Sequence, residues 1–220
     1  MSRQKKARFA DNAQRSNVIE PGKEVIDQIK GNWHETYFGN DNDITVELAC
    51  GRGEYTIGLA RMFPEKNFIG VDLKGDRIWK GSGVALDEGL TNVGFLRVHI
   101  LEILNYFEPG EIADLWITFP DPRPRDRDEK RRITHPRYID LYKQLLKEDG
   151  NIFFKTDNTG LFEYTLEVLN AREDVTDLVY TFDLYHSELK PECYDIRTRF
   201  EQKFNEQGHD IKYLRFKFKK

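Results

Sequence analysis

The sequence is poor in cysteine and has no long apolar run. Its 220 residues include two cysteines, Cys50 and Cys193, too few and too widely spaced for a disulfide framework or a four-ligand zinc site. Apolar runs such as 115–117 and 152–154 fall far short of a bilayer span, and the start MSRQKKARF has no stretch typical of a signal peptide. We therefore expect reduced thiols, no metal site, no membrane partner and a cytoplasmic location.

A uniformly basic surface is also absent, because the formal net charge is −4. The cations instead gather in three segments. Residues 1–15 hold five cations and one acid, and residues 123–137 hold seven cations and three acids. Residues 212–220 hold five cations and no acid. This asymmetry predicts a phosphate-facing surface on an acidic body, while charge runs at chain ends are equally typical of solvated tails.

Strand-like runs rich in β-branched and aromatic residues alternate with longer helical patterns, which predicts a parallel α/β sheet with helices on both faces. Strands are expected over 43–49, 67–72, 93–98, 112–118, 151–156, 178–184 and 211–218, and helices over 54–63, 75–88, 136–147 and 160–171. The length suits a single domain over residues 21–220. Residues 1–20 lack apolar periodicity, and we expect a mobile basic segment or one ordered only by a partner.

A glycine-containing turn, ELACGRGE, follows the first expected strand at residues 47–54. Gly51 and Gly53 permit positive φ and leave no Cβ between the backbone and a ligand. A dinucleotide fingerprint needs a third glycine where Thr56 stands, and Glu47 would repel a pyrophosphate, which disfavours a nicotinamide-dependent oxidoreductase. An acid there suits a cationic ligand. Asp72, at the tip of the second strand, is placed to accept two ribose hydroxyl protons or to cap a helix.

A proline-stiffened loop, FPDPRPRDRDEKRRIT, follows the fourth expected strand at residues 119–134. Two prolines fix Asp121 at the carboxyl edge of the sheet, where ligands bind in open α/β folds. An ordinary rigid surface turn would explain the prolines and the acid alone. It explains the cations packed behind them less well.

Together these motifs resemble those of the bacterial tRNA (guanine-N7)-methyltransferase family. The resemblance spans residues 46–204 and includes the glycine turn, FIGVD at 68–72, the loop from 119 to 133, FKTD at 154–157 and TRFEQK at 198–203. It implies a Rossmann-like, class I S-adenosylmethionine-dependent methyltransferase fold with a mostly parallel, seven-stranded sheet. It also implies an enzyme that methylates N7 of a guanine in the tRNA variable loop, with tRNA as its partner and S-adenosyl-L-methionine as its cofactor.

Carried over position by position, the resemblance implies roles for particular side chains. The implied cofactor contacts are Glu47, Gly51, Gly53, Asp72, His99 and Asp121. The implied contacts to the guanine or nearby tRNA are Arg125, Asp157, Thr198, Arg199, Phe200 and Glu201. Guanine N7 has a free lone pair and needs no strong base, so a carboxylate that stabilises the methylated base is the expected catalytic group. Asp121 is assigned that role, with Asp157 as the alternative.

Several positions depart from the family pattern, which usually has Gly at Ala49, Trp at Arg123, Lys at Arg125 and Asp at His99. His99 can bind the adenine edge or serve as an ordinary core or surface histidine. A guanidinium at Arg123 can stack on a base in place of an indole. The alternatives are a methyltransferase for another RNA, a protein or a small molecule, and a non-catalytic RNA-binding protein. Either a monomer or a homodimer is compatible with the sequence.

Overall fold

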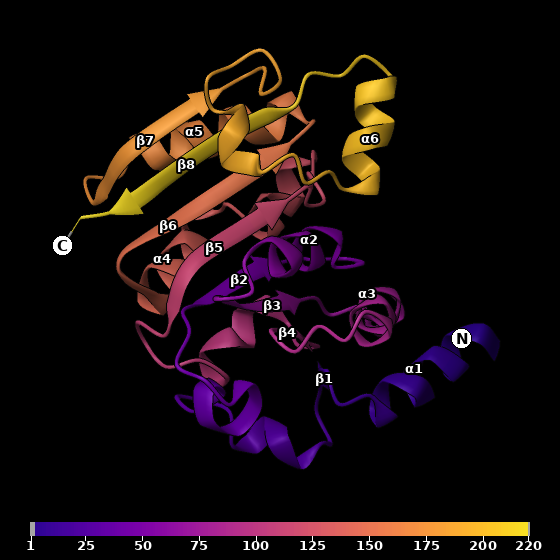
Figure 1. Cartoon of the computed structure of the whole chain (residues 1–220). Helices are drawn as coiled ribbons and strands as arrows, with labels where there is room; N and C mark the ends of the chain where they lie inside the picture. The colour runs from indigo at the N-terminus through magenta and orange to yellow at the C-terminus, as the bar shows by residue number, and fades with distance from the viewer. Residues whose placement is uncertain (1–2, 220) are drawn as a thin grey trace.

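A mixed eight-stranded sheet forms the centre of the protein in the computed structural model, which describes residues 3–219 (Figure 1). The strand order is β1-β4-β3-β2-β5-β6-β8-β7. β8 pairs antiparallel with β6 and β7, and the other pairs are parallel, which confirms the predicted mostly parallel sheet. The strands are β1 Val18–Ile19, β2 Ile44–Leu48, β3 Asn67–Val71, β4 Val93–Leu96, β5 Ile112–Thr118, β6 Leu146–Thr156, β7 Val175–Thr181 and β8 Lys212–Phe218.

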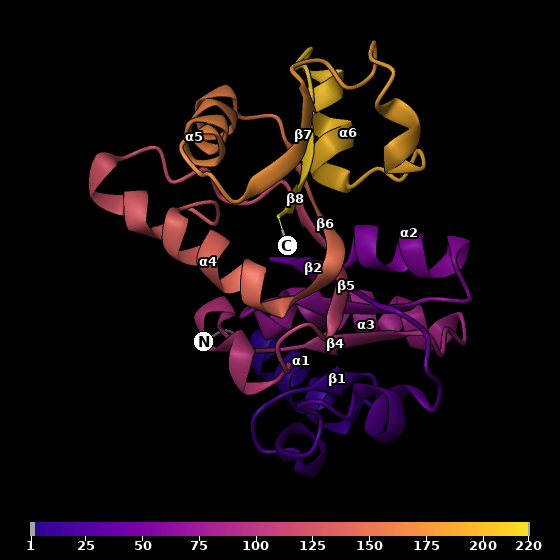
Figure 2. The ribbon, with the colours of Figure 1, turned by 90° about the vertical axis from the view of Figure 1, so that its left-hand side faces the viewer.

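Helices cover both faces of the sheet (Figure 2). α2 (Glu54–Met62) and α3 (Gly75–Asp87) lie on one face, and α4 (Pro136–Leu145) and α5 (Thr159–Asn170) on the other. Side chains at alternate positions of a strand pack on opposite faces of the sheet. Val46 belongs to the apolar cluster under α4 and α5, whereas Phe95 and Trp116 belong to the cluster under α2 and α3. Because both faces are covered, the central strands are apolar along almost their whole length.

The parallel register aligns the strand ends that carry the predicted site residues. Leu48 at the end of β2 lies opposite Val71 of β3 and Ile117 of β5. The chain therefore leaves β2, β3 and β5 at one edge of the sheet, the carboxyl edge. α6 (Arg199–Glu206), which the sequence pattern did not predict, also lies there.

The N-terminal segment contains helix α1 and strand β1, neither of which was predicted. β1 brings the number of strands in the sheet from the predicted seven to eight. α1 (Arg3–Gln14) packs against α3, where Asn12 Nδ2 donates to the Gly75 carbonyl at 2.8 Å and Trp79 Nε1 donates to Asp11 Oδ2 at 2.6 Å. These contacts are polar, which explains why no apolar periodicity marks the helix. Mobility in solution and a domain boundary at residue 21 stay predictions, and residues 1 and 2 lie outside the described residues.

The C-terminal cations do not join the site. β8 runs antiparallel to β6, so its end at Phe218 points away from the carboxyl edge. Lys212 is buried and donates to the carbonyls of Asp157 and Asp210, while Arg215 pairs with Glu192. The described residues of this third basic segment therefore do not extend the basic loop at 123–137, and a contact between this segment and phosphates stays a prediction. Within residues 3–219, no helix has the length and apolarity needed to cross a membrane.

Candidate functional site

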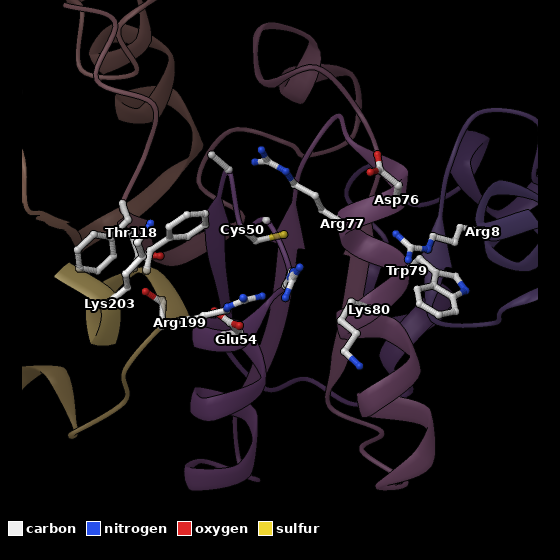
Figure 3. A pocket seen from close by; sticks show the side chains of 16 residues that line it. Arg8, Cys50, Glu54, Asp76, Arg77, Trp79, Lys80, Thr118, Arg199 and Lys203 are labelled. Carbon is white, nitrogen blue, oxygen red and sulfur yellow. The ribbon is translucent and has the colours of Figure 1, made fainter. Parts of the chain in front are cut away.

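Two cavities open at the carboxyl edge, on either side of Ala49, which lines both. The large cleft, of about 630 Å³, lies over the start of α2 between α3 and α6 (Figure 3). The small pocket, of about 210 Å³, is bounded by the segments after β3, β4 and β5. The volume of the large cleft falls in the range of about 300–1,000 Å³ typical of small-molecule sites.

The turn between β2 and α2 adopts left-handed backbone at Ala49, Gly51 and Gly53, with φ of 54°, 58° and 67°. Gly51 lines the large cleft, as expected of a residue that lets backbone approach a ligand. Gly53 lines neither cavity and has a packing role, because a Cβ there would lie 2.4 Å from Phe95 Cε1, and its predicted cofactor contact stays a prediction. Ala49 is the strained member, since the left-handed conformation costs a residue with a Cβ roughly 1–2 kcal/mol.

Glu47 lies beneath the two cavities and lines neither of them. Glu47 is 2% exposed. Its carboxyl group accepts hydrogen bonds from Thr118 Oγ1 at 2.6 Å, from the Thr56 amide at 2.8 Å and from the Thr56 hydroxyl. Burial raises the pKa of Glu47 to about 7. The side chain therefore ties the ends of β2 and β5 to the start of α2, and a direct cofactor contact stays a prediction.

The small pocket brings together Asp72, His99 and Asp121, three of the predicted cofactor contacts. Asp72 accepts the Gly51 amide at 3.0 Å and the Lys74 amide at 2.8 Å, one on each oxygen. His99 Nδ1 accepts the Leu101 amide at 3.2 Å and so caps the 3₁₀ helix Ile100–Asn105. Among the hydrogen bonds of the described residues none involves His99 Nε2, so that nitrogen is available to a ligand. The rest of the lining contains apolar and cationic residues, among them Val98, Ile100, Ile133 and Tyr138, and Lys74, Arg123 and Arg131.

Asp121 forms an ion pair with Arg123, the residue that stands in place of the family's tryptophan. The distance from Arg123 Nε to Asp121 Oδ2 is 3.2 Å, and the Asp121 side chain is 64% exposed. Arg132 Nε donates to the Arg123 carbonyl at 3.2 Å, and its guanidinium lies 4.4 Å from the ring of Tyr164 in α5. The loop is thereby fixed to α5 while the carboxylate of Asp121 remains accessible.

The TRFE motif divides between the cleft and the interior. Thr198, Arg199 and Phe200 line the large cleft, and Phe200 is 55% exposed. Glu201 was predicted to contact tRNA, but it is 1% exposed and forms a capping box with Thr198 at the start of α6. Its carboxylate faces the interior, where it pairs with Lys155 of β6. The sequence motif alone does not distinguish these two roles.

Two of the predicted tRNA contacts, Arg125 and Asp157, line neither cavity. Arg125 is exposed beside the 3₁₀ helix Asp126–Arg131, and the Asp157 carbonyl accepts Lys212 Nζ at 3.0 Å. Sequence reasoning missed Arg8 and Trp79, which line the cleft from α1 and α3. Within residues 3–219, no group of three or more His, Cys, Asp or Glu side chains is arranged to hold a metal ion.

Comparison with known proteins identifies the family. Residues 41–214 match the family model described as a putative methyltransferase. The chain is 48% identical to the tRNA (guanine-N(7)-)-methyltransferase of Cytophaga hutchinsonii over 99% of both chains. It is 42% identical to the protein of the same name from Bacteroides thetaiotaomicron, over 99% of this chain and 86% of that protein.

Among solved structures, the 16S rRNA methyltransferase KamB superposes with a TM-score of 0.62 over 83% of this chain and 91% of that one. Its sequence identity of 12% means that this likeness shows the fold alone. The full-length relatives and the family model carry the assignment. The chain belongs to the tRNA (guanine-N7)-methyltransferase family.

Proposed function

We propose that this chain transfers the methyl group of S-adenosylmethionine to N7 of a guanine in the tRNA variable loop. The observation that carries the proposal is the junction of the small pocket with the large cleft at Ala49. A methyl donor whose adenosine lies in the small pocket can reach a nucleotide in the large cleft at that residue. Family membership supports the reaction, since the relatives are named for guanine N7 of tRNA.

The residues of the small pocket fit the adenosine of S-adenosylmethionine. Each Asp72 oxygen accepts one backbone amide, which leaves a lone pair on each for a ribose hydroxyl. His99 Nε2 can bond the edge of an adenine, and Val98 and Ile133 offer apolar surface to its ring. When bound, this cofactor supplies a methyl group on a positively charged sulfur.

The chain's own task in the reaction is alignment and charge stabilisation. N7 carries a lone pair and no proton, so no residue has to act as a strong base. Holding donor and base in line can lower the barrier by roughly 7–11 kcal/mol. Asp121 lines the small pocket and Asp157 does not, which favours Asp121 as the carboxylate that stabilises the positive charge arriving on the base.

The large cleft suits a nucleotide of RNA. The exposed ring of Phe200, on α6, and the ring of Phe119, after β5, offer surfaces on which a base can stack. Six cations line the same cleft against two acids: Arg8, Arg52, Arg77, Lys80, Arg199 and Lys203, against Glu54 and Asp76. An unpaired base of a folded RNA is the ligand that this combination favours.

The test is nucleoside mass spectrometry of unmodified tRNA after incubation with the protein and isotopically labelled S-adenosylmethionine. We expect labelled 7-methylguanosine from the wild type. We expect a loss of at least about 100-fold for Asp121→Ala, in line with removal of one electrostatic group from an active site, at an unchanged melting temperature. Ribosomal RNA is incubated in parallel, and label there but not in tRNA would support the rival RNA substrate. Cofactor binding without any methyl transfer would support a non-catalytic RNA-binding protein.

A further inference from the structure

We propose that Arg8, Arg52, Arg77 and Lys80, the cationic wall of the large cleft, form a subsite for a phosphodiester of the RNA backbone. In this arrangement the cleft holds the target base near α6 and grips the adjoining backbone on the side of α1 and α3. The inference deepens the proposed function and rests on it for the identity of the RNA.

The charges of the cationic wall are not neutralised within the protein. In residues 3–219, no acidic side chain lies within ion-pair distance of Arg8, Arg52, Arg77 or Lys80. The two acids of the cleft are engaged by other groups: Glu54 Oε2 accepts the Arg199 amide at 2.8 Å, and Asp76 lies 3.4 Å from Lys5. The wall therefore presents uncompensated positive charge to the cleft.

Arg8 is held at this wall by a specific structure. Its guanidinium lies 4.9 Å from the centroid of the Trp79 ring, and the indole Nε1 of Trp79 donates to Asp11 Oδ2. Arg15 lies 5.1 Å from the same ring. Stacking of this kind stabilises a cation in a fixed place without neutralising its charge. α1 thus contributes a positioned cation to the cleft.

The two walls of the cleft differ in chemistry. Arg77 and Lys80, on α3, lie across the cleft from Arg199 and Lys203 on α6 (Figure 3). Phe200 is on α6, and the ring of Phe119 lies 6.0 Å from Nζ of Lys155, which pairs with Glu201 of α6. The ring of Trp79, in contrast, is engaged by Arg8 of α1. A base therefore has stacking partners near α6, and an anionic group has unpaired cations near α3.

Some cations elsewhere in the fold are paired with acids. At the opposite edge of the sheet, Lys143 and Arg172 pair with Asp174, and Lys147 pairs with Asp43. Many other cations among the described residues also have no acidic partner, so the feature that marks the cationic wall is that its four unpaired cations line one cleft. Phosphate oxygens are the acceptors that arginine and lysine recognise in RNA.

The experiment measures binding of full-length protein to an unmodified tRNA transcript by fluorescence anisotropy at several salt concentrations. The variant is Arg77→Gln with Lys80→Gln. The matched control is Lys217→Gln with Lys219→Gln, which removes the same charge from β8 and the residue after it, at the opposite edge of the sheet. All four side chains are partly or fully exposed, so the melting temperature should not change.

We expect the α3 variant to bind tRNA about tenfold more weakly and to lower the slope of log K against log salt by about 0.7–1.8, the contribution of one to two phosphates. The control should retain the wild-type slope, and the affinity for S-adenosylmethionine should stay within about twofold in both variants because neither touches the small pocket. Equal slopes for the α3 variant and the control would overturn the subsite.

Failure of the subsite and failure of the proposed function give different results. If the wild type forms 7-methylguanosine in tRNA but the α3 variant keeps the wild-type slope, the subsite is wrong and the function stands. If the wild type forms no 7-methylguanosine but the α3 variant selectively loses RNA affinity, the function is wrong and the subsite stands.

Discussion

Lys155 Nζ lies 2.7 Å from Glu201 Oε1, and both side chains are 1% exposed. Tyr185 donates a hydrogen bond to the same Glu201 oxygen at 2.8 Å, and the ring of Tyr55 lies 5.1 Å from Lys155 Nζ. The Lys155 carbonyl also accepts the amide of Phe119, which lines the large cleft. One buried pair therefore links β6 and the segment after β5 to the start of α6.

Removing one member of this pair should cost far more stability than removing both. Lys155→Met leaves the Glu201 carboxylate buried without a counter-charge, and we expect a loss of about 3–5 kcal/mol in the free energy of unfolding. Lys155→Met with Glu201→Gln should recover most of that loss, because a neutral amide can still accept the Tyr185 hydroxyl. Urea denaturation measures both, and equal stability of the single and double variants would contradict the prediction.

The ion pair between Arg123 and Asp121 should weaken binding of a cationic ligand in the small pocket. S-adenosylmethionine carries a sulfonium charge and S-adenosylhomocysteine does not. Arg123→Gln should therefore raise the affinity for S-adenosylmethionine relative to that for S-adenosylhomocysteine by about two- to fivefold, which corresponds to the free energy of an exposed ion pair. Calorimetric titration with both ligands measures the ratio. Arg127→Gln in the same loop is the control, and an equal change in both variants would refute the role of Arg123.

Ala49 offers a test of stored backbone strain at the junction of the cavities. Ala49→Gly keeps the left-handed conformation but removes its cost of roughly 1–2 kcal/mol. Against this gain, glycine loses more chain entropy on folding than alanine does, at a cost of about 0.5–1 kcal/mol. We expect a net gain of about 0.5–1 kcal/mol in the free energy of unfolding. Ala85→Gly, in the ordinary backbone of α3, should lose about 1 kcal/mol or more. A loss in both variants would mean that Ala49 is not strained.

Most of the sheet and the helices on it could be predicted from sequence, because apolar strands alternate with amphipathic helices and with glycine or proline turns. β5 at Ile112–Thr118 and α2 at Glu54–Met62 match the expected ranges within one residue. α1 could not be predicted in this way. Its contacts to α3 include side-chain hydrogen bonds and cation–π contacts besides the ring of Phe9 against Gly75, and they leave no periodic apolar signature.

The site was predictable where a side chain follows a strand end and not where its environment decides its role. Asp72 and Asp121 line one pocket, as parallel strands ending at one edge require. Glu47 and Glu201 have the same chemistry, but both are buried and engaged with interior partners. Burial depends on packing between segments distant in the chain, such as β6 against α6, which a short motif does not encode.

Glu47 should make the protein less stable as pH rises from about 4.5 to about 7. Its pKa is about 7 in the folded protein against 4.5 for an exposed glutamate, because burial disfavours its charged form. Below pH 4.5 the carboxyl is protonated in both states and contributes no pH dependence. Between these values the unfolded chain loses its proton first, so unfolding is progressively favoured, by up to about 3 kcal/mol above pH 7.

Glu47→Gln isolates this effect, because an amide cannot ionise but can accept the Thr56 amide and hydrogen-bond to Thr118. Urea denaturation at pH 5 and pH 8 should show a larger fall in unfolding free energy for the wild type than for Glu47→Gln. The exposed Glu65→Gln should keep the wild-type pH dependence, since the Glu65 side chain is solvated in the folded protein as it is in the unfolded chain. Parallel pH profiles for the wild type and Glu47→Gln would mean that Glu47 is already ionised at pH 5, with its charge fully compensated by Thr56 and Thr118.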